Sequence, residues 1–259
     1  MILYYVVHSF TDTVFHGNPA GVCPLEEWLD DELMQRIAAE NRLSETAFFV
    51  RKEDHFELRW FTPAIEVDLC GHATLASAYV LFDHLGHEGE IVTFHTQSGE
   101  LTVWKDGNFL VMDFPTRPGE PIEAPEALIE GLGSTPGEVY LARDYLAIFE
   151  SEQDIRNLKP DFAALETLDC EGVIASAPGH DADFVSRFFA PLMGIPEDPV
   201  TGSAHSTLTP FWASRLGKKQ LVAHQVSERG GVLKCTLRGD RVLIAGQAVL
   251  YVKGFLSTD

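Results

Sequence analysis

The chain has 259 residues, of which 45% are hydrophobic and 22% are charged, and its formal net charge is −20 at pH 7. Such a composition is typical of a globular protein. The acidic balance argues against nucleic acid and anionic membrane as partners, because both require a basic face. A protein of this charge that binds an anion must use local donors.

The N-terminus M-I-L-Y-Y-V-V-H-S-F lacks a basic region and a small-residue cleavage site, so it predicts a strand and not a signal peptide. No apolar run has the length of a membrane span. The four cysteines are scattered and form no C-x-x-C pair. This pattern favours a reduced, cytoplasmic protein without a structural metal site.

In the first half, β-forming residues predict strands at 2–8, 46–50 and 55–61. Apolar residues near helical spacing predict a helix at 27–40, which Asn41 ends. Residues 15–21, F-H-G-N-P-A-G, are turn formers and predict a loop. Glu45 directly precedes the strand that is predicted to begin at Thr46.

A helix that is apolar on nearly every face is predicted from Gly71 to Phe82. A helix without a polar face should be enclosed by other structure. Strands are predicted to follow at 90–96, 99–104 and 109–114. The run Pro115–Gly119 then interrupts the pattern and predicts a domain boundary, which gives domains of residues 1–116 and 117–259.

The second half predicts the same mixture of strands and short helices. Its strands are expected at 137–142, 144–149, 171–176, 183–189, 220–226, 231–238 and 241–252, and its short helices at 125–131, 151–157 and 161–166. A second enclosed helix is expected to open at Gly202. Pro210 lies inside it, and a kink or break is predicted there because proline removes a backbone bond.

One segment occurs twice, at 59–86 and again at 187–217. The matched residues are Arg59 with Arg187, Phe61 with Phe189, Pro63 with Pro191, Asp68 with Asp198, Gly71-His72-Ala73 with Gly202-Ser203-Ala204, and Leu85-Gly86 with Leu216-Gly217. Short hairpin-length links favour antiparallel pairing. We therefore predict an α+β protein of two similar domains, each a curled, mainly antiparallel sheet around a central helix, facing each other across a cleft.

The repeated loop has the form of an anion site. The first N–H groups of a helix lack internal partners, and the helix dipole adds partial positive charge there. Two such helix starts could hold a carboxylate without lysine or arginine. Ser203 could cap its helix and donate to a ligand, and His72 could donate or cap. The alternative is that both glycines only begin buried helices.

The sequence allows more than one role for each of three further side chains. Glu45 is either a partly buried acid/base, with its pKa raised towards the useful range, or a surface acid at a strand end. Asp198 either bonds the N–H groups of its own loop, or orients His72 or accepts from a substrate. Cys70 could be a thiolate at a helix N-terminus, but its repeat position holds Thr201.

Four stretches, H-G-N-P-A-G (16–21), L-S-E-T-A-F (43–48), D-L-C-G-H-A-T-L-A (68–76) and E-D-P-V-T-G-S-A-H (197–205), resemble the signature blocks of the phenazine-biosynthesis isomerase-like family, PhzF. That family is related in fold to diaminopimelate epimerase, with the active site between two pseudo-symmetric domains. The resemblance implies Glu45 as the catalytic acid/base, with His72 and Asp198 beside it. It also implies a set of substrate-binding residues: Asn18, Ser44, Gly71, Gly202 and Ser203.

From this resemblance we expect a cofactor-independent isomerase that moves a proton within a small anionic, amino-acid-like or dihydrohydroxyanthranilate-like metabolite. A cytoplasmic homodimer is the family-type expectation. Two alternatives stay open: a racemase or epimerase that uses Cys70, and a non-enzymatic protein that binds a small anion. Thr201 stands where a two-thiol epimerase has its second cysteine, and threonine cannot serve as that thiol.

Overall fold

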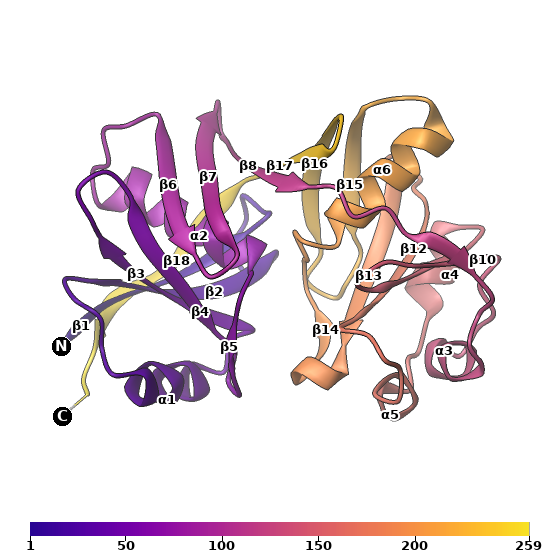
Figure 1. The fold of residues 1–259 in the computed structure, drawn as a ribbon, viewed down its shortest axis with the longest axis horizontal. Coiled ribbons are helices and arrows are strands. Elements are labelled where there is room, and N and C mark those ends of the chain that lie inside the picture. Colours follow the sequence, from indigo (N-terminus) through magenta and orange to yellow (C-terminus); the bar gives the residue numbers. More distant parts are fainter. Residues whose placement is uncertain (259) are drawn as a thin grey trace. The chain divides into compact units, whose positions relative to one another are not determined.

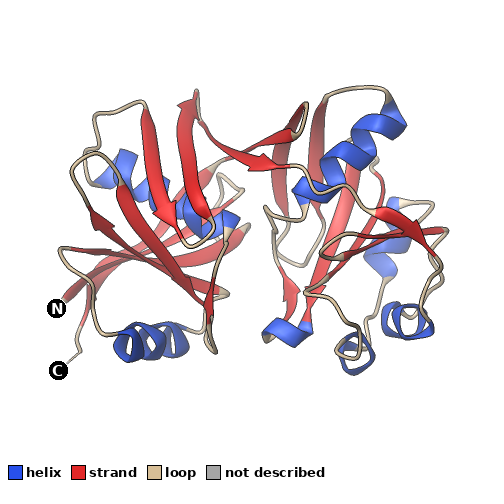
Figure 2. Cartoon of the chain, in the orientation of Figure 1, coloured by secondary structure: helices blue, strands red, loops and turns tan. Residues whose placement is uncertain are grey.

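The computed structural model describes residues 1–258, and the chain divides into two compact units. Unit 1 comprises Met1–Asp113 and the C-terminal segment from Ala245, and unit 2 comprises Phe114–Ile244. The chain passes between them within β8 (Phe109–Pro115) and β17 (Arg241–Gly246). Strands predominate in both units, and the helices are few (Figure 2). None of the helices in residues 1–258 has the length and apolar character that a membrane span requires.

Unit 1 is a mixed sheet with two helices. Its further strands are β1 (Ile2–Ser9), β2 (Asn18–Leu25), β3 (Glu45–Arg51), β4 (Phe56–Phe61), β5 (Glu66–Val67), β6 (Ile91–Thr96), β7 (Gly99–Asp106) and β18 (Ala248–Leu256), and its helices are α1 (Asp31–Asn41) and α2 (Gly71–His84). The pairs β2–β3 and β4–β6 are parallel. The other registered pairs of this unit are antiparallel.

Helix α2 is the enclosed helix that the sequence predicted. It begins at Gly71, as expected, and contacts β1, β2, β3 and β18 (Figure 1). Ten of its fourteen residues are buried. Because nearly every face is apolar, the helix is stable only inside the sheet that surrounds it.

Unit 2 repeats this plan. Its further strands are β9 (Glu120–Ile122), β10 (Glu138–Leu141), β11 (Tyr145–Ile148), β12 (Val173–Pro178), β13 (Phe184–Ala190), β14 (Ile195–Asp198), β15 (Gln220–Gln225) and β16 (Gly231–Arg238). Its helices are α3 (Glu126–Leu132), α4 (Glu152–Asn157), α5 (Phe162–Leu165), a 3₁₀ turn (Pro191–Met193) and α6 (His205–Leu216). The pairs β11–β12 and β13–β15 are parallel, and their flanking pairs are antiparallel.

The order of pairing is the same in both units. The series β2, β3, β4, β5 and β6 of unit 1 pairs as β11, β12, β13, β14 and β15 do in unit 2. In register, Trp60 faces Val67, and Phe188 faces Asp198. The counterpart of Asp198 is therefore Val67, and the predicted match with Asp68 is wrong.

The matched arginines support the repeat. Arg59 Nε and Nη2 donate to the two carboxylate oxygens of Glu66 at 2.7 and 2.8 Å. Arg187 makes the same bidentate bond to Glu197, at the same two distances. Each guanidinium also lies over the phenylalanine two residues along its strand, Phe61 or Phe189. The repeat is thus present in the structure as well as in the sequence.

The predicted C-terminal boundary is wrong, because β18 belongs to unit 1. This strand pairs antiparallel with β1 from Ile2 to Ser9, with a bulge near Val6 (Figure 1). In unit 2 the corresponding place beside β10 is taken by β9, at the start of that unit. The predicted single strand at 241–252 is accordingly two strands, β17 and β18.

The predicted loop at 15–21 is also wrong in part, because strand β2 begins at Asn18. Its residues Asn18 to Val22 pair with β1. A Cβ on Gly21 would lie 2.9 Å from Thr46 Oγ1, so this position needs glycine for close strand packing and not for a turn. Helix α1 begins at Asp31 and not at residue 27, since Asp30 caps it by accepting from the N–H of Glu32, and it ends at Asn41 as predicted.

Helix α6 differs from its prediction in two respects, its first residue and its course at Pro210. It begins at His205, after a turn at 202–204 in which the N–H of His205 donates to the carbonyl of Gly202 at 3.0 Å. It also continues through Pro210 without a break. Proline leaves the carbonyl of Ser206 without its helical donor, and the N–H of Arg117 donates to that carbonyl at 2.9 Å.

Candidate functional site

In unit 1, the first residue of β3 meets the first turn of α2. Glu45 opens the strand and is 8% exposed, and its Oε2 lies 3.1 Å from Nε2 of His72. Cys70 precedes the helix, and its Sγ lies 3.5 Å from Nδ1 of the same ring. The predicted residues Glu45, Gly71 and His72 are thus brought together, with Cys70 among them.

The imidazole of His72 is neutral at physiological pH. Its burial disfavours the charged ring and lowers its pKa to about 3. The contact with Glu45 is therefore one between a carboxyl group and a neutral imidazole, not a full ion pair. The neutral ring can carry a proton on one nitrogen and accept on the other.

The two other predicted residues of unit 1 lie next to this cluster. Asn18 is fully buried at the start of β2 and pairs in register with Ser9. The hydroxyl of Ser9 donates to the carbonyl of His72 at 2.7 Å, so Ser9 connects the start of β2 with the start of α2. Ser44 is partly buried directly before Glu45.

In unit 2, Asp198 lies in a buried hydrogen-bonded network. The hydroxyl of Thr201 donates to Asp198 Oδ2 at 2.5 Å. Gln225 accepts from the N–H of Thr201 at 2.8 Å and donates to the carbonyl of Asp198 at 2.8 Å. The side chain of Asp198 is thus held in place by Thr201, the residue that corresponds to Cys70 in the repeated segment.

The start of α6 is held like that of α2. His205 Nδ1 lies 2.9 Å from the carbonyl of Thr201, and Thr74 Oγ1 donates to the carbonyl of Cys70 at 2.5 Å in unit 1. Burial lowers the pKa of His205 to about 4, so this ring is also neutral. Gly202 is buried beside it.

Ser203 does not cap α6, contrary to one predicted role. The helix has no side-chain cap, and the hydroxyl of Ser203 instead accepts from Nη2 of Arg143 at 3.3 Å. Arg143 also contacts Asp144 Oδ2 at 3.3 Å and Glu171 Oε2 at 3.2 Å. Burial raises the pKa of Asp144. Arg143 was not identified from the sequence. Its one distinguishing feature there is its position in the tight turn between two predicted strands.

The Glu45–Cys70–His72 cluster could also hold a metal ion. One ligand atom from each residue lies within 4.8 Å of the others, and all three residues are buried. Thiol, imidazole and carboxylate together suit a divalent transition metal such as zinc. Sequence analysis predicted no metal site.

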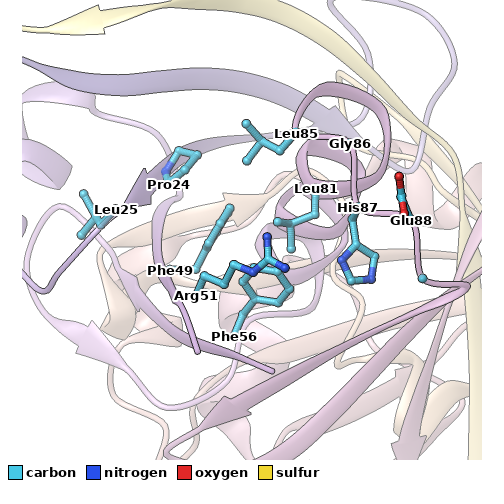
Figure 3. A pocket seen from close by; sticks show the side chains of 11 residues that line it. Pro24, Leu25, Phe49, Arg51, Phe56, Leu81, Leu85, Gly86, His87 and Glu88 are labelled. Atoms are coloured by element: carbon cyan, nitrogen blue, oxygen red, sulfur yellow. The ribbon is translucent and has the colours of Figure 1, made fainter. Parts of the chain in front are cut away.

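A pocket of about 510 Å³ lies elsewhere in unit 1 (Figure 3). Its walls include Phe49, Phe56 and Leu81, with Arg51 and His87 also lining it. Arg51 ends β3, which Glu45 begins, so the two lie about 20 Å apart along the strand. The pocket contains none of the predicted site residues.

Comparison with known proteins finds a family model and relatives that match nearly the full length of the chain. The family model for phenazine biosynthesis-like proteins, PhzC-PhzF, matches residues 7–254. An uncharacterized isomerase of Pseudomonas aeruginosa is 52% identical over 252 residues, which cover 97% of each chain. A human phenazine biosynthesis-like domain-containing protein is 40% identical over 283 residues, covering 98% of each.

Solved structures of proteins with the same fold also match nearly the full length of this chain. The crystal structure of a PhzF-family protein of Enterococcus faecalis matches with a TM-score of 0.95 at 47% identity, over 98% of each chain. A hydroxyproline epimerase of Agrobacterium vitis matches with a TM-score of 0.65 at 12% identity, over 98% of this chain and 91% of that one. The second likeness shows a common fold alone. The predicted fold class, with its likeness to the epimerases, is confirmed.

Proposed function

Because the chain belongs to the phenazine biosynthesis-like family, PhzC-PhzF, we propose that it is a cofactor-independent isomerase that moves a proton within a small carboxylated substrate. The observation that carries this proposal is the contact of 3.1 Å between the carboxyl group of Glu45 and the neutral ring of His72. Relatives at 52% and 51% identity that are named isomerases support the reaction class.

Glu45 is the acid/base in this proposal. Its carboxylate takes a proton from an activated carbon of the substrate, and the electron pair of the broken C–H bond is delocalised within the substrate. The protonated carboxyl group then returns the proton to a different atom of the same molecule. Substrate and product are therefore isomers, and Glu45 is regenerated without a redox step.

His72 and Asp198 orient the substrate and stabilise charge. A neutral imidazole can donate to an oxygen on which negative charge develops, and it does so without the cost of placing a cation in a buried site. Asp198, fixed by the hydroxyl of Thr201, can accept from a substrate hydroxyl or amine.

A racemase or epimerase that uses Cys70 is the second candidate. It is favoured by one observation, the distance of 3.5 Å between Cys70 Sγ and His72 Nδ1, across which the imidazole could accept the thiol proton. The corresponding position of unit 2 holds Thr201, whose hydroxyl already donates to Asp198. This candidate therefore lacks the second thiol of a two-base mechanism.

Glu45→Gln tests the proposal. The amide preserves the shape of the side chain but cannot take up a proton, so small molecules that co-purify with this variant should include unconverted substrate, identified by mass spectrometry. That molecule, incubated with the wild-type protein in D₂O, should be converted and gain deuterium at one carbon. Cys70→Ser is the matched control and should convert it at a comparable rate.

Full conversion by Glu45→Gln would overturn the proposal. Loss of conversion in Cys70→Ser, with Glu45→Gln still active, would favour the epimerase instead. A recovered ligand that neither protein alters and that gains no deuterium would indicate a protein that only binds a small anion.

A further inference from the structure

Cys70 has no part in the proposed proton transfer, yet its thiol lies within the acid/base cluster. Its Sγ lies 3.5 Å from Nδ1 of His72, and Nε2 of the same ring lies 3.1 Å from Oε2 of Glu45. One ligand atom from each of the three residues lies within 4.8 Å of the other two. In residues 1–258 no other group of three or more histidine, cysteine, aspartate or glutamate side chains converges in this way.

We propose that Glu45, Cys70 and His72 bind a thiophilic divalent cation, for which Zn²⁺ is the best match, and that the bound ion stops proton transfer by holding the carboxylate of Glu45. The binding stands on the geometry of unit 1 alone. The inhibition rests on the proposed isomerase function, because it requires Glu45 to be the base. Cys70 thereby acquires a role that the isomerisation itself does not give it.

The distances within the cluster suit tetrahedral coordination. Zinc bonds of about 2.3 Å to sulfur and about 2.0 Å to nitrogen or oxygen place neighbouring ligand atoms about 3.3–3.6 Å apart. The distance of 3.5 Å between Cys70 Sγ and His72 Nδ1 is already in this range. No ligand atom of the cluster is farther than 4.8 Å from another, so closure around an ion needs side-chain movements of about 1 Å. Three protein ligands leave the fourth position to water or to a ligand atom of another molecule.

The ring of His72 gives a second indication of a binding partner. It is 3% exposed, and its Nε2 makes no aligned hydrogen bond in residues 1–258, although the carboxyl group of Glu45 is in contact with it. A buried polar atom without a hydrogen bond calls for a ligand, a water or an ion. A metal bound at the cluster would fix the orientation of this ring.

Charge and burial favour a divalent ion. A bound thiolate and a carboxylate carry two negative charges, which a divalent cation neutralises, and the thiol proton passes to solvent when the ion binds. Glu45 and Cys70 are only 8% and 5% exposed, so an unbalanced charge among them would be costly. The thiolate selects zinc and similar ions over Mg²⁺ and Ca²⁺, which prefer oxygen ligands.

The matching junction of unit 2 has none of these ligands. The residues that precede Thr46 and Val173 correspond, because these two face the matched phenylalanines of the repeated segment. By this register and by the repeat, unit 2 has Gly172 in place of Glu45, Thr201 in place of Cys70, and Ser203 in place of His72. Unit 2 thus forms the same junction of strand and helix without them, so the fold itself does not require the three ligands.

The first test adds Co²⁺ to the untagged, reduced full chain, because cobalt replaces zinc and reports its ligands by absorption. A cobalt–thiolate charge-transfer band in the near ultraviolet is expected in the wild-type protein, and Zn²⁺ but not Mg²⁺ should remove it. Cys70→Ser should lose the band. Cys170→Ser, which changes a half-buried cysteine outside the cluster, is the matched control and should keep it. Cys70→Ala takes the place of the serine variant if that variant does not fold.

Calorimetry with Zn²⁺ measures the contribution of each ligand. Cys70→Ser and His72→Gln should each weaken zinc binding at least about tenfold, and Glu45→Gln should weaken it while keeping the cobalt–thiolate band. His95→Gln is the control for a surface site, because the rings of His55 and His95 stack at 3.8 Å outside the cluster. It should leave the cobalt band unchanged. Zinc should also raise the unfolding temperature of the wild-type protein more than that of Cys70→Ser.

Inhibition is measured on the substrate recovered from Glu45→Gln, with each rate expressed relative to the same protein without metal. Zinc should slow the wild-type protein, a chelator should restore its rate, and Cys70→Ser should be slowed less. An absent cobalt–thiolate band, or equal zinc affinity in wild type, Cys70→Ser and His72→Gln, would overturn the site. Zinc that binds the cluster and leaves the rate unchanged would overturn the inhibition alone.

The two proposals fail in different ways. A rate that rises with zinc would overturn both the inhibition and the cofactor-independent mechanism. If Glu45→Gln is fully active, or no substrate is converted, the isomerase mechanism fails and the inhibition fails with it. The cobalt band and the zinc affinities still decide the metal site in that case, because neither measurement needs a substrate.

Discussion

Glu45 and Gly172 occupy the same register position in the two units: Glu45 is the first residue of β3, and Gly172 directly precedes β12. One unit therefore has a carboxyl group where the other has no side chain. The two copies of the fold are alike in topology and unlike in chemistry at this position. A single-carboxylate mechanism follows more naturally from this asymmetry than a mechanism with two equivalent bases.

The asymmetry is built into the packing of unit 2. A Cβ on Gly172 would lie 2.3 Å from the ring of Phe188, which is buried. Gly172→Ala should therefore destabilise the protein by about 1–3 kcal/mol in chemical denaturation. Gly254→Ala is the matched control, because nothing lies within 4 Å of its Cβ, and it should cost little. Phe188→Leu should recover part of the loss; equal stability of the two alanine variants would contradict the close contact.

Thr201→Val should destabilise unit 2 because it removes the hydroxyl that donates to Asp198 at 2.5 Å. A buried carboxyl group that loses its donor costs about 1–3 kcal/mol. Thr201→Ser keeps the hydroxyl and should stay close to the wild type in urea denaturation. If both variants unfold at the same urea concentration, the hydroxyl contributes nothing and Asp198 is fixed in another way.

The two matched arginines should differ in their tolerance of lysine. Arg187 donates to the carbonyls of Ile155 and Leu158, at 3.2 and 2.9 Å, in addition to Glu197. Arg59 instead makes its further bond to Asp31, whose side chain is 76% exposed. Arg187→Lys should therefore cost at least about 1 kcal/mol more than Arg59→Lys, because it removes the guanidinium donor from two carbonyls near the end of α4. Equal losses in unfolding free energy would contradict this account.

Acid should destabilise the fold through His72 and His205. Burial lowers the pKa of these rings to about 3 and about 4, so the folded state resists protonation that the unfolded chain accepts below its ordinary pKa near 6.5. Their contribution is complete above pH 6.5 and is lost as the pH falls towards 4, at about 1.4 kcal/mol per pH unit for each ring. His205→Gln should reduce the measured slope by one proton. An unchanged slope would show that His205 is protonated equally in both states.

Local signals predicted much of the fold, and they singled out Glu45 and His72, which the structure brings together. The apolar run after Gly71 predicted an enclosed helix, and the repeat of Arg59 and Arg187 predicted two similar units. Strand β2 was missed because Asn18-Pro19-Ala20-Gly21 has the composition of a turn. The need for glycine at Gly21 comes from Thr46, a neighbour only in the folded sheet.

The same reason explains why the sequence did not single out Arg143. The contact of Glu45 with His72 joins two motifs that each stand out in the sequence. Arg143 stands in an unremarkable hairpin turn, and its contact with Ser203 joins residues 60 positions apart. Such a contact depends on the pairing of whole strands, which residue composition does not encode.

The pairing of β18 with β1 has a consequence during synthesis of the protein. The ribosome releases the chain from its N-terminus, so β1 emerges early and its partner strand emerges last. Unit 2, continuous from Phe114 to Ile244, can complete its sheet while unit 1 still lacks a strand. The unit that carries Glu45 is therefore the last to close, because its sheet lacks the partner of β1 until translation has passed β18.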